Sequence, residues 1–408
     1  MMKESNRLSR RSFVGGLLSA TAGYWLLPSG EARAEEGDFW KPKASPLVKQ
    51  VMWTRAHAYF AYPHSNGFLT GSTFVVALRQ PGTQKGGCWD LDFISFDPVT
   101  RTEKQLAHVP GVRMYYSIAN NGQMLVTDAK GARLIDLNQG GASKVIYEAP
   151  SPWAPGDVSD LSPDGGAAVF PLWKSPPNSS QIVYCDIAKG SNRVLLDKPW
   201  AMNHPHFSPF DPKWTAFCHE GAPVSDRIWA WNKTAAAEGR MLFNQVTPQG
   251  VLNVGHERAR FDKEGEIFVA YRSAKTAGLA GLYEVGFDKT SRQVSASETY
   301  LHCNISHDGR WAVVDSQPVG DPKNPDSVAW GDVTPPRPQL PRRSDVIAIN
   351  MKTGARQFLY AGRMAPRHPW HVHPHISPDG RWVVFNDYEQ KRVCTIEIDQ
   401  AALETFLA

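Results

Sequence analysis

A single turn phrase recurs along the chain, and it constrains the fold more than any other feature of the sequence. Its clearest copies read Ser-Pro-Asp-Gly, at residues 162–165 and 377–380, and each stands between short runs rich in Val, Ile, Phe and Trp. Proline presets φ, aspartate caps the turn and glycine takes the position with positive φ, so the phrase is typical of a tight hairpin. Weaker copies are centred near residues 71, 122, 211, 265 and 309.

The distance between these turns predicts the architecture. Most spacings run from 43 to 54 residues, which is the length of a four-stranded propeller blade. Seven turns therefore predict an all-β fold, a seven-bladed β-propeller of four-stranded antiparallel blades, with residues 35–408 as a single domain. The wide gap before the last turn is explained by a loop over 317–343 that carries seven prolines. The alternative is a pair of two-sheet β-sandwiches, which leaves the spacing unexplained.

The first 34 residues have the order of an export signal. Arg10 and Arg11 precede an apolar stretch over 14–27, and Ala-Arg-Ala follows at 32–34. This order is typical of a secretory signal, and the paired arginines resemble those of the twin-arginine pathway. An uncleaved anchor is the alternative, but the stretch is shorter than the ~20 residues that a membrane span requires. We expect residues 1–34 to be a cleaved twin-arginine signal peptide and the mature protein to be periplasmic, without a membrane anchor.

Charge and cysteine content narrow the classes of partner. The formal net charge is +4, and residues 1–34 contribute +3 of it, from five basic and two acidic residues. No run of lysine or arginine follows, so the sequence does not support binding to nucleic acid. Five cysteines without a Cys-x-x-Cys spacing favour buried free thiols, with one disulfide as the alternative. No oligomeric state is predicted.

Histidines stand at related positions before several of the turns. Counted back from the turn serine or its equivalent, the offset is four for His64, His204, His302 and His373, six for His256 and His371, and two for His206 and His375. All offsets are even, and side chains on a strand alternate with period two. We therefore expect these histidines to share one face of the innermost strand of each blade and to converge in the central channel. The alternative is that each one bonds a neighbouring blade and seals the channel.

Three of these side chains, and a fourth histidine nearby in the sequence, are candidates for a metal site. His371 and His373 point to one side and can share an ion, and His302 of the preceding blade can complete the site. His368, just before Pro369, is a fourth candidate. Neutral imidazole is the commonest protein ligand for divalent transition metals.

Several short motifs extend this pattern. They are His-Pro-His-Phe-Ser-Pro at 204–209, Phe-Cys-His-Glu-Gly at 217–221, Asp-Arg-Ile-Trp at 226–229, Gly-His-Glu at 255–257, His302 before an Asp-Gly turn, and His-Val-His at 371–373. In order and spacing they resemble the oligogalacturonate lyases, over roughly residues 50–395. The resemblance implies a seven-bladed propeller that splits short pectic oligosaccharides by β-elimination with a manganese-type ion.

The resemblance also implies individual roles. The general base of the family matches His256, and its substrate-binding, charge-stabilising arginine matches Arg227. Three metal-binding histidines match His302, His371 and His373. The fourth ligand of the family is a glutamine, and His368 stands at that position here. The resemblance therefore implies a divalent metal, Mn²⁺ first, and the extra imidazole keeps Zn²⁺ or another transition metal as alternatives.

Further residues are expected to contact the sugar. We expect His204, His219 and Glu220 to bind substrate, and Glu220 and Glu257, which each follow a site histidine, to orient it. The alternative for Arg227 is a structural ion pair with Asp226 or with a neighbouring blade.

These features together favour a polysaccharide lyase that cleaves short uronate-containing oligosaccharides, most of all oligogalacturonides. A metal held by neutral histidines can neutralise the uronate carboxylate, and an unligated histidine can then remove the C5 proton. The first alternative is a non-catalytic periplasmic β-propeller that binds or scaffolds other proteins. A hydrolase is the second, but no Gly-x-Ser-x-Gly motif occurs, and Glu220 with Glu257 is the one carboxylate pair on offer.

Overall fold

The computed structural model describes residues 45–174, 179–221, 224–271, 276, 278–297, 299–316, 342–365 and 368–408. The predicted signal peptide and most of the proline-rich loop lie outside these residues. Within them the regular secondary structure is β-sheet apart from one 3-10 helix, η1 (Leu137–Gln139), and one α-helix, α1 (Gln400–Leu407). The predicted all-β class is thus confirmed. No helix in the described part of the chain has the length and apolar character needed to span a bilayer.

Four sheets have four antiparallel strands each, and in three of them every strand pairs with the next one along the chain. The first contains β15 (Met202–Phe207), β16 (Trp214–His219), β17 (Ile228–Asn232) and β18 (Ala236–Met241). The second contains β21 (Asn253–Ala259), β22 (Glu266–Tyr271), β23 (Gly281–Val285) and β24 (Ser291–Ala296). The third contains β25 (Tyr300–Ile305), β26 (Trp311–Ser316), β27 (Arg342–Asn350) and β28 (Arg356–Met364).

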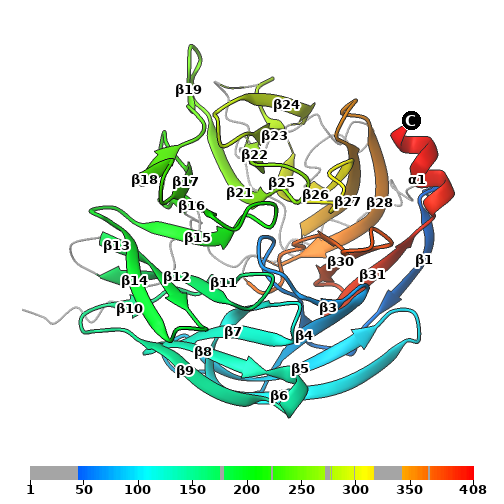
Figure 1. The fold of residues 1–408 in the computed structure, drawn as a ribbon. Coiled ribbons are helices and arrows are strands. Elements are labelled where there is room, and N and C mark those ends of the chain that lie inside the picture. Colours follow the sequence, from blue (N-terminus) through cyan, green and yellow to red (C-terminus); the bar gives the residue numbers. More distant parts are fainter. Residues whose placement is uncertain are drawn as a thin grey trace, which may run out of the picture.

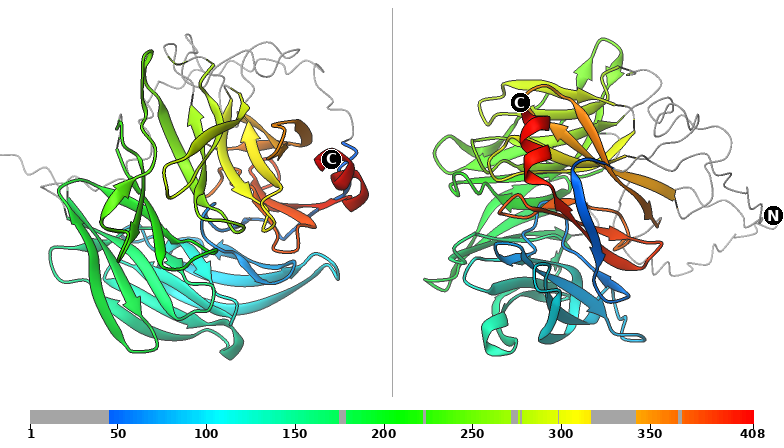
Figure 2. Two further views of the ribbon diagram at one scale, coloured as in Figure 1. Left: turned by 45° about the horizontal axis from the view of Figure 1, so that its top comes forward. Right: turned by 90° about the vertical axis from the view of Figure 1, so that its right-hand side faces the viewer.

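The fourth such sheet joins the two ends of the described chain. It contains β29 (His375–Ile376), β30 (Trp382–Asp387), β31 (Arg392–Ile398) and, as its outer strand, β1 (Val48–Trp53). Because the first strand completes the last sheet, the chain closes on itself. Helix α1 lies on the outside near β1 (Figures 1 and 2), and it buries Leu403 and Leu407 against the apolar core.

The remaining strands form larger sheets. One contains β10 (Ala154–Pro155), β11 (Asp160–Leu161), β12 (Ala167–Lys174), β13 (Ser179–Asp186) and β14 (Ser191–Lys198). The other contains β2 (Ala58–Tyr59), β3 (Phe68–Thr70), β4 (Thr73–Arg79), β5 (Trp89–Asp97), β6 (Thr102–Ile118), β7 (Gln123–Asp128), β8 (Gly131–Asp136) and β9 (Ala142–Glu148). A separate hairpin joins β19 (Val246–Thr247) to β20 (Gly250–Val251).

The long strand β6 connects two parts of the eight-stranded sheet. It pairs with β5 up to Val112 and with β7 from Val112 onward. Division of the sheet at this residue gives one unit with β2, β3, β4, β5 and the first part of β6, and a second unit with the rest of β6, β7, β8 and β9, so that the described residues form seven units. The predicted count of seven blades depends on this division and stays a prediction.

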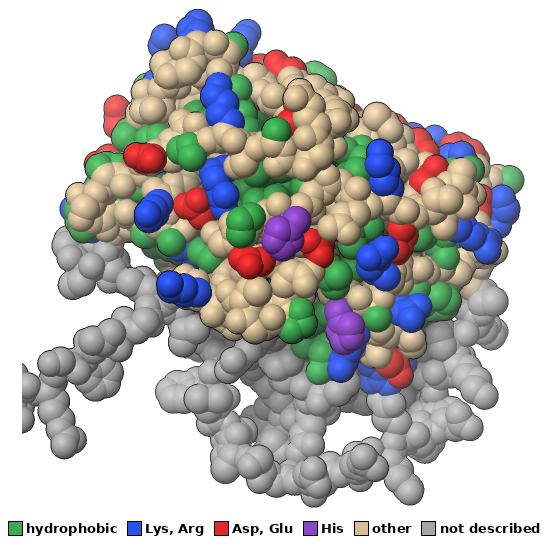
Figure 3. All heavy atoms as spheres, turned by 90° about the horizontal axis from the view of Figure 1, so that it is seen from below, with side chains coloured by type: hydrophobic (Ala, Val, Ile, Leu, Met, Phe, Trp, Pro, Cys, Tyr) green, Lys and Arg blue, Asp and Glu red, His purple; other side chains and the backbone are tan. Residues whose placement is uncertain are grey.

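The sheets surround a common centre, with one strand of each nearest to it (Figure 1). Neighbouring inner strands touch, as β11 does with β15, β21 with β25, and β25 with β29. On the face seen in Figure 3, basic and acidic side chains are interspersed among the described residues.

The core consists of layers between neighbouring sheets. On β22, Ile267 and Val269 pack toward the following sheet, while Phe268 and Ala270 pack toward the preceding one. Both faces of the strand are therefore buried, and the alternation with period two is retained there. The five cysteines are all buried and free, as predicted.

The recurring turns have the predicted chemistry. Ser162 donates its hydroxyl hydrogen bond to Asp164 at 2.6 Å, and the same carboxylate accepts from the Gly166 amide at 2.9 Å. Gly309 has φ of 68°, and a Cβ added there would lie 2.2 Å from the carboxylate of Asp262 in the preceding sheet. Glycine is thus required both by the backbone and by the close approach of the neighbouring turn.

Candidate metal centre and active site

The inner strands β15, β21 and β25 each contain a β-bulge where they carry a site histidine. The register shifts between Asn203 and His206, between Gly255 and Arg258, and between Tyr300 and Cys303. Bulges redirect side chains and are common beside active sites.

Three site histidines also have unusual backbone conformations. His204, His256 and His373 have φ of 54°, 56° and 46°. A non-glycine residue in this left-handed region costs energy, and such residues cluster at functional sites. The even offsets in the sequence assumed unbroken strand alternation, and the structure differs at these points. Bulges and left-handed residues bring the rings together instead.

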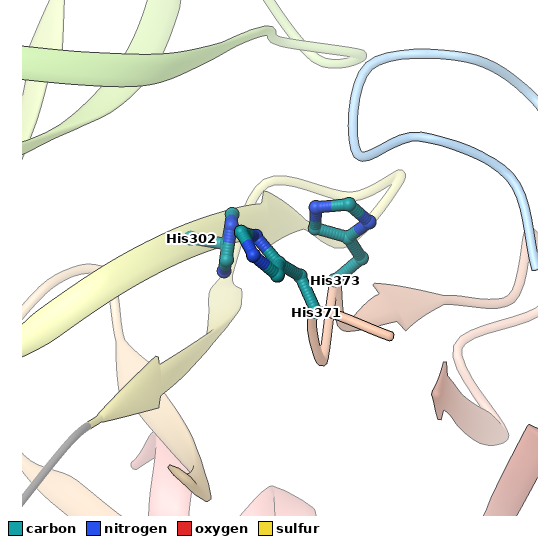
Figure 4. A group of neighbouring side chains, drawn as sticks. All are labelled: His302, His371 and His373. Carbon is teal, nitrogen blue, oxygen red and sulfur yellow. The ribbon is translucent and has the colours of Figure 1, made fainter. Parts of the chain in front are cut away.

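The predicted metal ligands do lie together. One ring nitrogen from each of His302, His371 and His373 falls within 4.8 Å of the others, and the three rings lie close to one another (Figure 4). His302 comes from β25, and the other two come from the segment before β29. The ring of His368 has its centroid 4.1 Å from that of His371 and 5.1 Å from that of His373.

Several nitrogens in this cluster lack a hydrogen-bond partner within the described residues. They are Nε2 of His302, Nδ1 of His368 and both ring nitrogens of His373. Burial lowers the pKa of His302 to about 3, and burial, followed by the neighbouring His302, lowers that of His373 well below its usual value. Neutral imidazoles with unused lone pairs are the donor set that a divalent transition metal requires, so the residues fit such an ion.

Asp315 fixes the orientation of one of these rings. Its Oδ1 accepts from Nδ1 of His302 at 2.9 Å and from the His302 amide at 2.7 Å, while Oδ2 accepts from Ser344 at 2.9 Å. Nδ1 of His302 therefore carries the proton, and Nε2 is left for a metal. Burial raises the pKa of Asp315 to about 7. Sequence reasoning missed this residue, although an acid directly after the buried run Trp311–Val314 was a usable signal.

His256 lies beside the cluster without joining it. Its ring centroid is 4.1 Å from that of His302. Nδ1 faces the carbonyl oxygen of Leu301 at 2.5 Å and also contacts the hydroxyl of Tyr271. Because a carbonyl can only accept, Nδ1 carries the proton, and the lone pair is on Nε2. Burial and then His302 lower the pKa of His256 well below its usual value, so the ring is neutral. Tyr271 was missed from the sequence.

Arg227 lies between two carboxylates. Its Nε is 3.4 Å from Glu257, and its two terminal nitrogens are each 3.4 Å from Glu220. Glu257 belongs to the neighbouring sheet, so the expected pairing with another blade is present. Asp226, the other expected partner, instead faces Nδ1 of His219 at 2.8 Å.

The two glutamates stay ionised. Burial acts to raise their pKa values, but Arg227 and His204 outweigh it and hold both below the usual range, Glu257 by far the more. His204 places Nδ1 3.0 Å from Glu257, and these two residues with Cys218 form a second group whose ligand atoms lie within 4.8 Å of one another.

The remaining predicted residues lie at the edges. His219 stacks near Trp200, with ring centroids 4.1 Å apart. His64 lies beside His204 and His206, and its ring centroid is 4.9 Å from the centroid of each. His375 faces the carbonyl of Ala61 and does not join either group.

Comparison with known proteins shows similarity at the level of fold. An oligogalacturonate lyase in complex with manganese matches with a TM-score of 0.69 at 18% identity, over 88% of this chain and 96% of that one. An oligogalacturonate lyase from Vibrio parahaemolyticus matches with a TM-score of 0.70 at 17% identity, over 88% and 97%. The tricorn protease matches with a TM-score of 0.52 at 11% identity, over 88% and 34%. No family model and no curated protein sequence matches this chain.

Proposed function

We propose that this chain is a lyase that cleaves short uronate-containing oligosaccharides, oligogalacturonides first among them, by metal-assisted β-elimination. The observation that carries the proposal is the group formed by His302, His371 and His373, in contact with a neutral His256. Two solved structures of similar fold are oligogalacturonate lyases, and one of them is a manganese complex. The similarity of fold supports a lyase, and the arrangement of the four histidines supports proton removal assisted by a metal.

The proposed roles follow from the contacts. His302, His371 and His373, with His368 beside them, would hold a divalent ion. When bound, such an ion supplies positive charge that neutralises a substrate carboxylate and makes the adjacent C–H more acidic. Nε2 of His256 accepts the C5 proton, since its Nδ1 is already protonated.

Arg227 would hold the substrate. Its guanidinium is fixed by Glu220 and Glu257, so it loses little conformational freedom when it contacts a carboxylate or sugar hydroxyls. Glu220 lies 3.9 Å from Nε2 of His204, and these two residues together with His219 would contact the sugar.

The metal and the cellular location complete the proposal. We take Mn²⁺ as the first candidate from the manganese-bound neighbour, with Zn²⁺ or another transition metal as alternatives because His368 adds an imidazole. We also propose export by the twin-arginine signal at 1–34 and a periplasmic mature protein.

The test is elimination by the purified mature protein with Mn²⁺. Oligogalacturonides should give the ultraviolet absorbance of a 4,5-unsaturated uronate, and absence of the product from pectic, ulvan and alginate fragments alike would contradict the proposal. His256→Ala should abolish turnover and keep the metal content. The matched control is His307→Ala, in the turn that follows β25, which should keep both turnover and metal content. Loss of metal from His256→Ala would mean that base and ligand are exchanged.

A further inference from the structure

His204 is the counterpart of His256 on the neighbouring inner strand. Each lies in a β-bulge, on β15 and β21 respectively, with φ of 54° and 56°. Their ring environments are opposite. His256 faces a carbonyl and a hydroxyl, whereas His204 faces two carboxylates, with Nδ1 3.0 Å from Glu257 and Nε2 3.9 Å from Glu220. Opposed environments of this kind separate an acid from a base in one active site.

The two carboxylates beside His204 carry one more negative charge than Arg227 can balance. The side chains of Glu220 and Glu257 are 15% and 0% exposed, and Arg227 supplies one positive charge to the two of them. One negative charge would remain without compensation, which is costly in a buried site. An imidazolium at His204 would balance it, because Nδ1 lies 3.0 Å from Glu257, while Nε2 lies 3.9 Å from Glu220, too far for a hydrogen bond to it.

The two histidines beside His204 do not face a pair of carboxylates in the described part of the chain. Among the described residues His64 makes no hydrogen bond to a carboxylate, and burial followed by the adjacent histidines lowers its pKa well below the usual value. His206 faces the His204 carbonyl with Nδ1 and accepts from the Ala259 amide at Nε2, so both of its nitrogens are used structurally. Tyr62 lies beside both His204 and the proposed metal ligand His373, with ring centroids 5.1 and 4.9 Å away.

The proposed reaction needs such a donor. In a galacturonide, H5 and the axial O4 are on opposite faces of the sugar ring, so the base that removes H5 cannot also protonate O4. The departing alkoxide is a poor leaving group without a proton. A second group, placed apart from His256 but in the same site, must supply it.

We propose that His204 is the general acid of the elimination, an inference that rests on the proposed function. The C5–H bond breaks and its proton goes to Nε2 of His256, while its electron pair forms the C4–C5 double bond. The C4–O4 bond breaks, and O4 takes the proton from Nε2 of His204. His256 then releases a proton to water and His204 takes one up, so that no co-reactant is consumed.

The test compares two leaving groups. His204→Gln keeps the shape of the side chain and a donor toward Glu257, but it cannot deliver a proton. On an oligogalacturonide its kcat should fall by roughly 10²–10⁴-fold, the usual contribution of a general acid. On a 4-deoxy-4-fluoro-galacturonide, where fluoride leaves without protonation, it should stay within about tenfold of the wild type. His256→Ala should fail on both substrates.

His64→Gln is the matched control, because it alters an equally buried ring in the same group and should affect the two substrates alike. Equal impairment of His204→Gln on both substrates, or none on either, would overturn the inference. So would loss of one bound metal ion from His204→Gln, since His204, Cys218 and Glu257 would then be ligands. A wild type without elimination on either substrate would refute the proposed function itself.

A second measurement needs no turnover. The ¹⁵N resonances of His204, assigned by their absence in His204→Gln, should show both ring nitrogens protonated in the resting protein. A neutral tautomer would contradict the charge argument.

Discussion

Replacement of Asp315 by asparagine tests the metal centre through a residue that does not touch the metal. The carboxylate accepts three hydrogen bonds, from the amide and Nδ1 of His302 and from the Ser344 hydroxyl. An asparagine oxygen in the place of Oδ1 still accepts from the amide and Nδ1 of His302, and the NH₂ group faces the Ser344 hydroxyl, which can accept, but the negative charge of the carboxylate is lost. The ring of His302 then keeps its tautomer and direction but loses the charged acceptor that raises the basicity of Nε2.

The expected magnitude follows from these contacts. Loss of such an outer partner typically costs 10–100-fold in metal affinity, or about 1.4–2.8 kcal/mol. The metal-free protein should also lose about 1 kcal/mol of stability, because hydrogen bonds to a charged acceptor are replaced by hydrogen bonds to a neutral one. The Asp315→Asn variant should therefore bind Mn²⁺ more weakly than the wild type and should still fold.

The assay is calorimetric titration of chelator-stripped protein with Mn²⁺. Asp160→Asn is the matched control. Asp160 is an equally buried aspartate that accepts from Ser117 at 2.6 Å and from the Phe207 amide at 3.0 Å, and it lies between two other sheets. It should change stability without changing affinity. Asp315→Asn binding Mn²⁺ as tightly as the wild type would refute the assignment of His302 as a ligand.

Three further changes have defined outcomes. His368→Gln should shift competitive binding from Zn²⁺ toward Mn²⁺, because an amide oxygen is a harder ligand than imidazole; an unchanged ratio would exclude His368 from the site. Tyr271→Phe should lower kcat about tenfold, with KM and metal content retained, by releasing the ring of His256; unaltered kinetics would mean that Leu301 alone fixes the ring. Burial raises the pKa of Asp160 to about 6, so the folded state binds the extra proton and the unfolding free energy should fall by about 3 kcal/mol in all as pH rises from well below about 4 to well above about 6. Denaturant titrations should show a flatter pH dependence for Asp160→Asn, and an equal slope would contradict the burial argument.

The fold could be predicted because its determinants are local. The Ser-Pro-Asp-Gly turns need only residues adjacent in sequence, and their spacing sets the size of the repeating unit. The same repeat predicted that His302, His371 and His373 would meet, although they are separated by a whole sheet.

The residues that hold the site histidines in place could not be predicted from the sequence in the same way. Asp315 reaches His302 only through the pairing of β25 with β26, and Tyr271 reaches His256 through the pairing of β21 with β22. Both contacts depend on β-bulges, which no residue pattern in the sequence predicts. The sequence left two roles open for Arg227, contact with substrate or a structural ion pair. The structure shows ion pairs with Glu220 and Glu257, and both of these residues lie in the candidate site.

The most direct test of the central claim is digestion of an oligogalacturonide in H₂¹⁸O with the metal-loaded protein, followed by mass spectrometry of the fragments. Elimination breaks the C4–O4 bond without water. The account therefore predicts a fragment lighter by one water than its saturated counterpart, with no ¹⁸O incorporated during cleavage. Saturated fragments that carry ¹⁸O would show a hydrolase, intact substrate would show a binding protein, and either result would contradict the account.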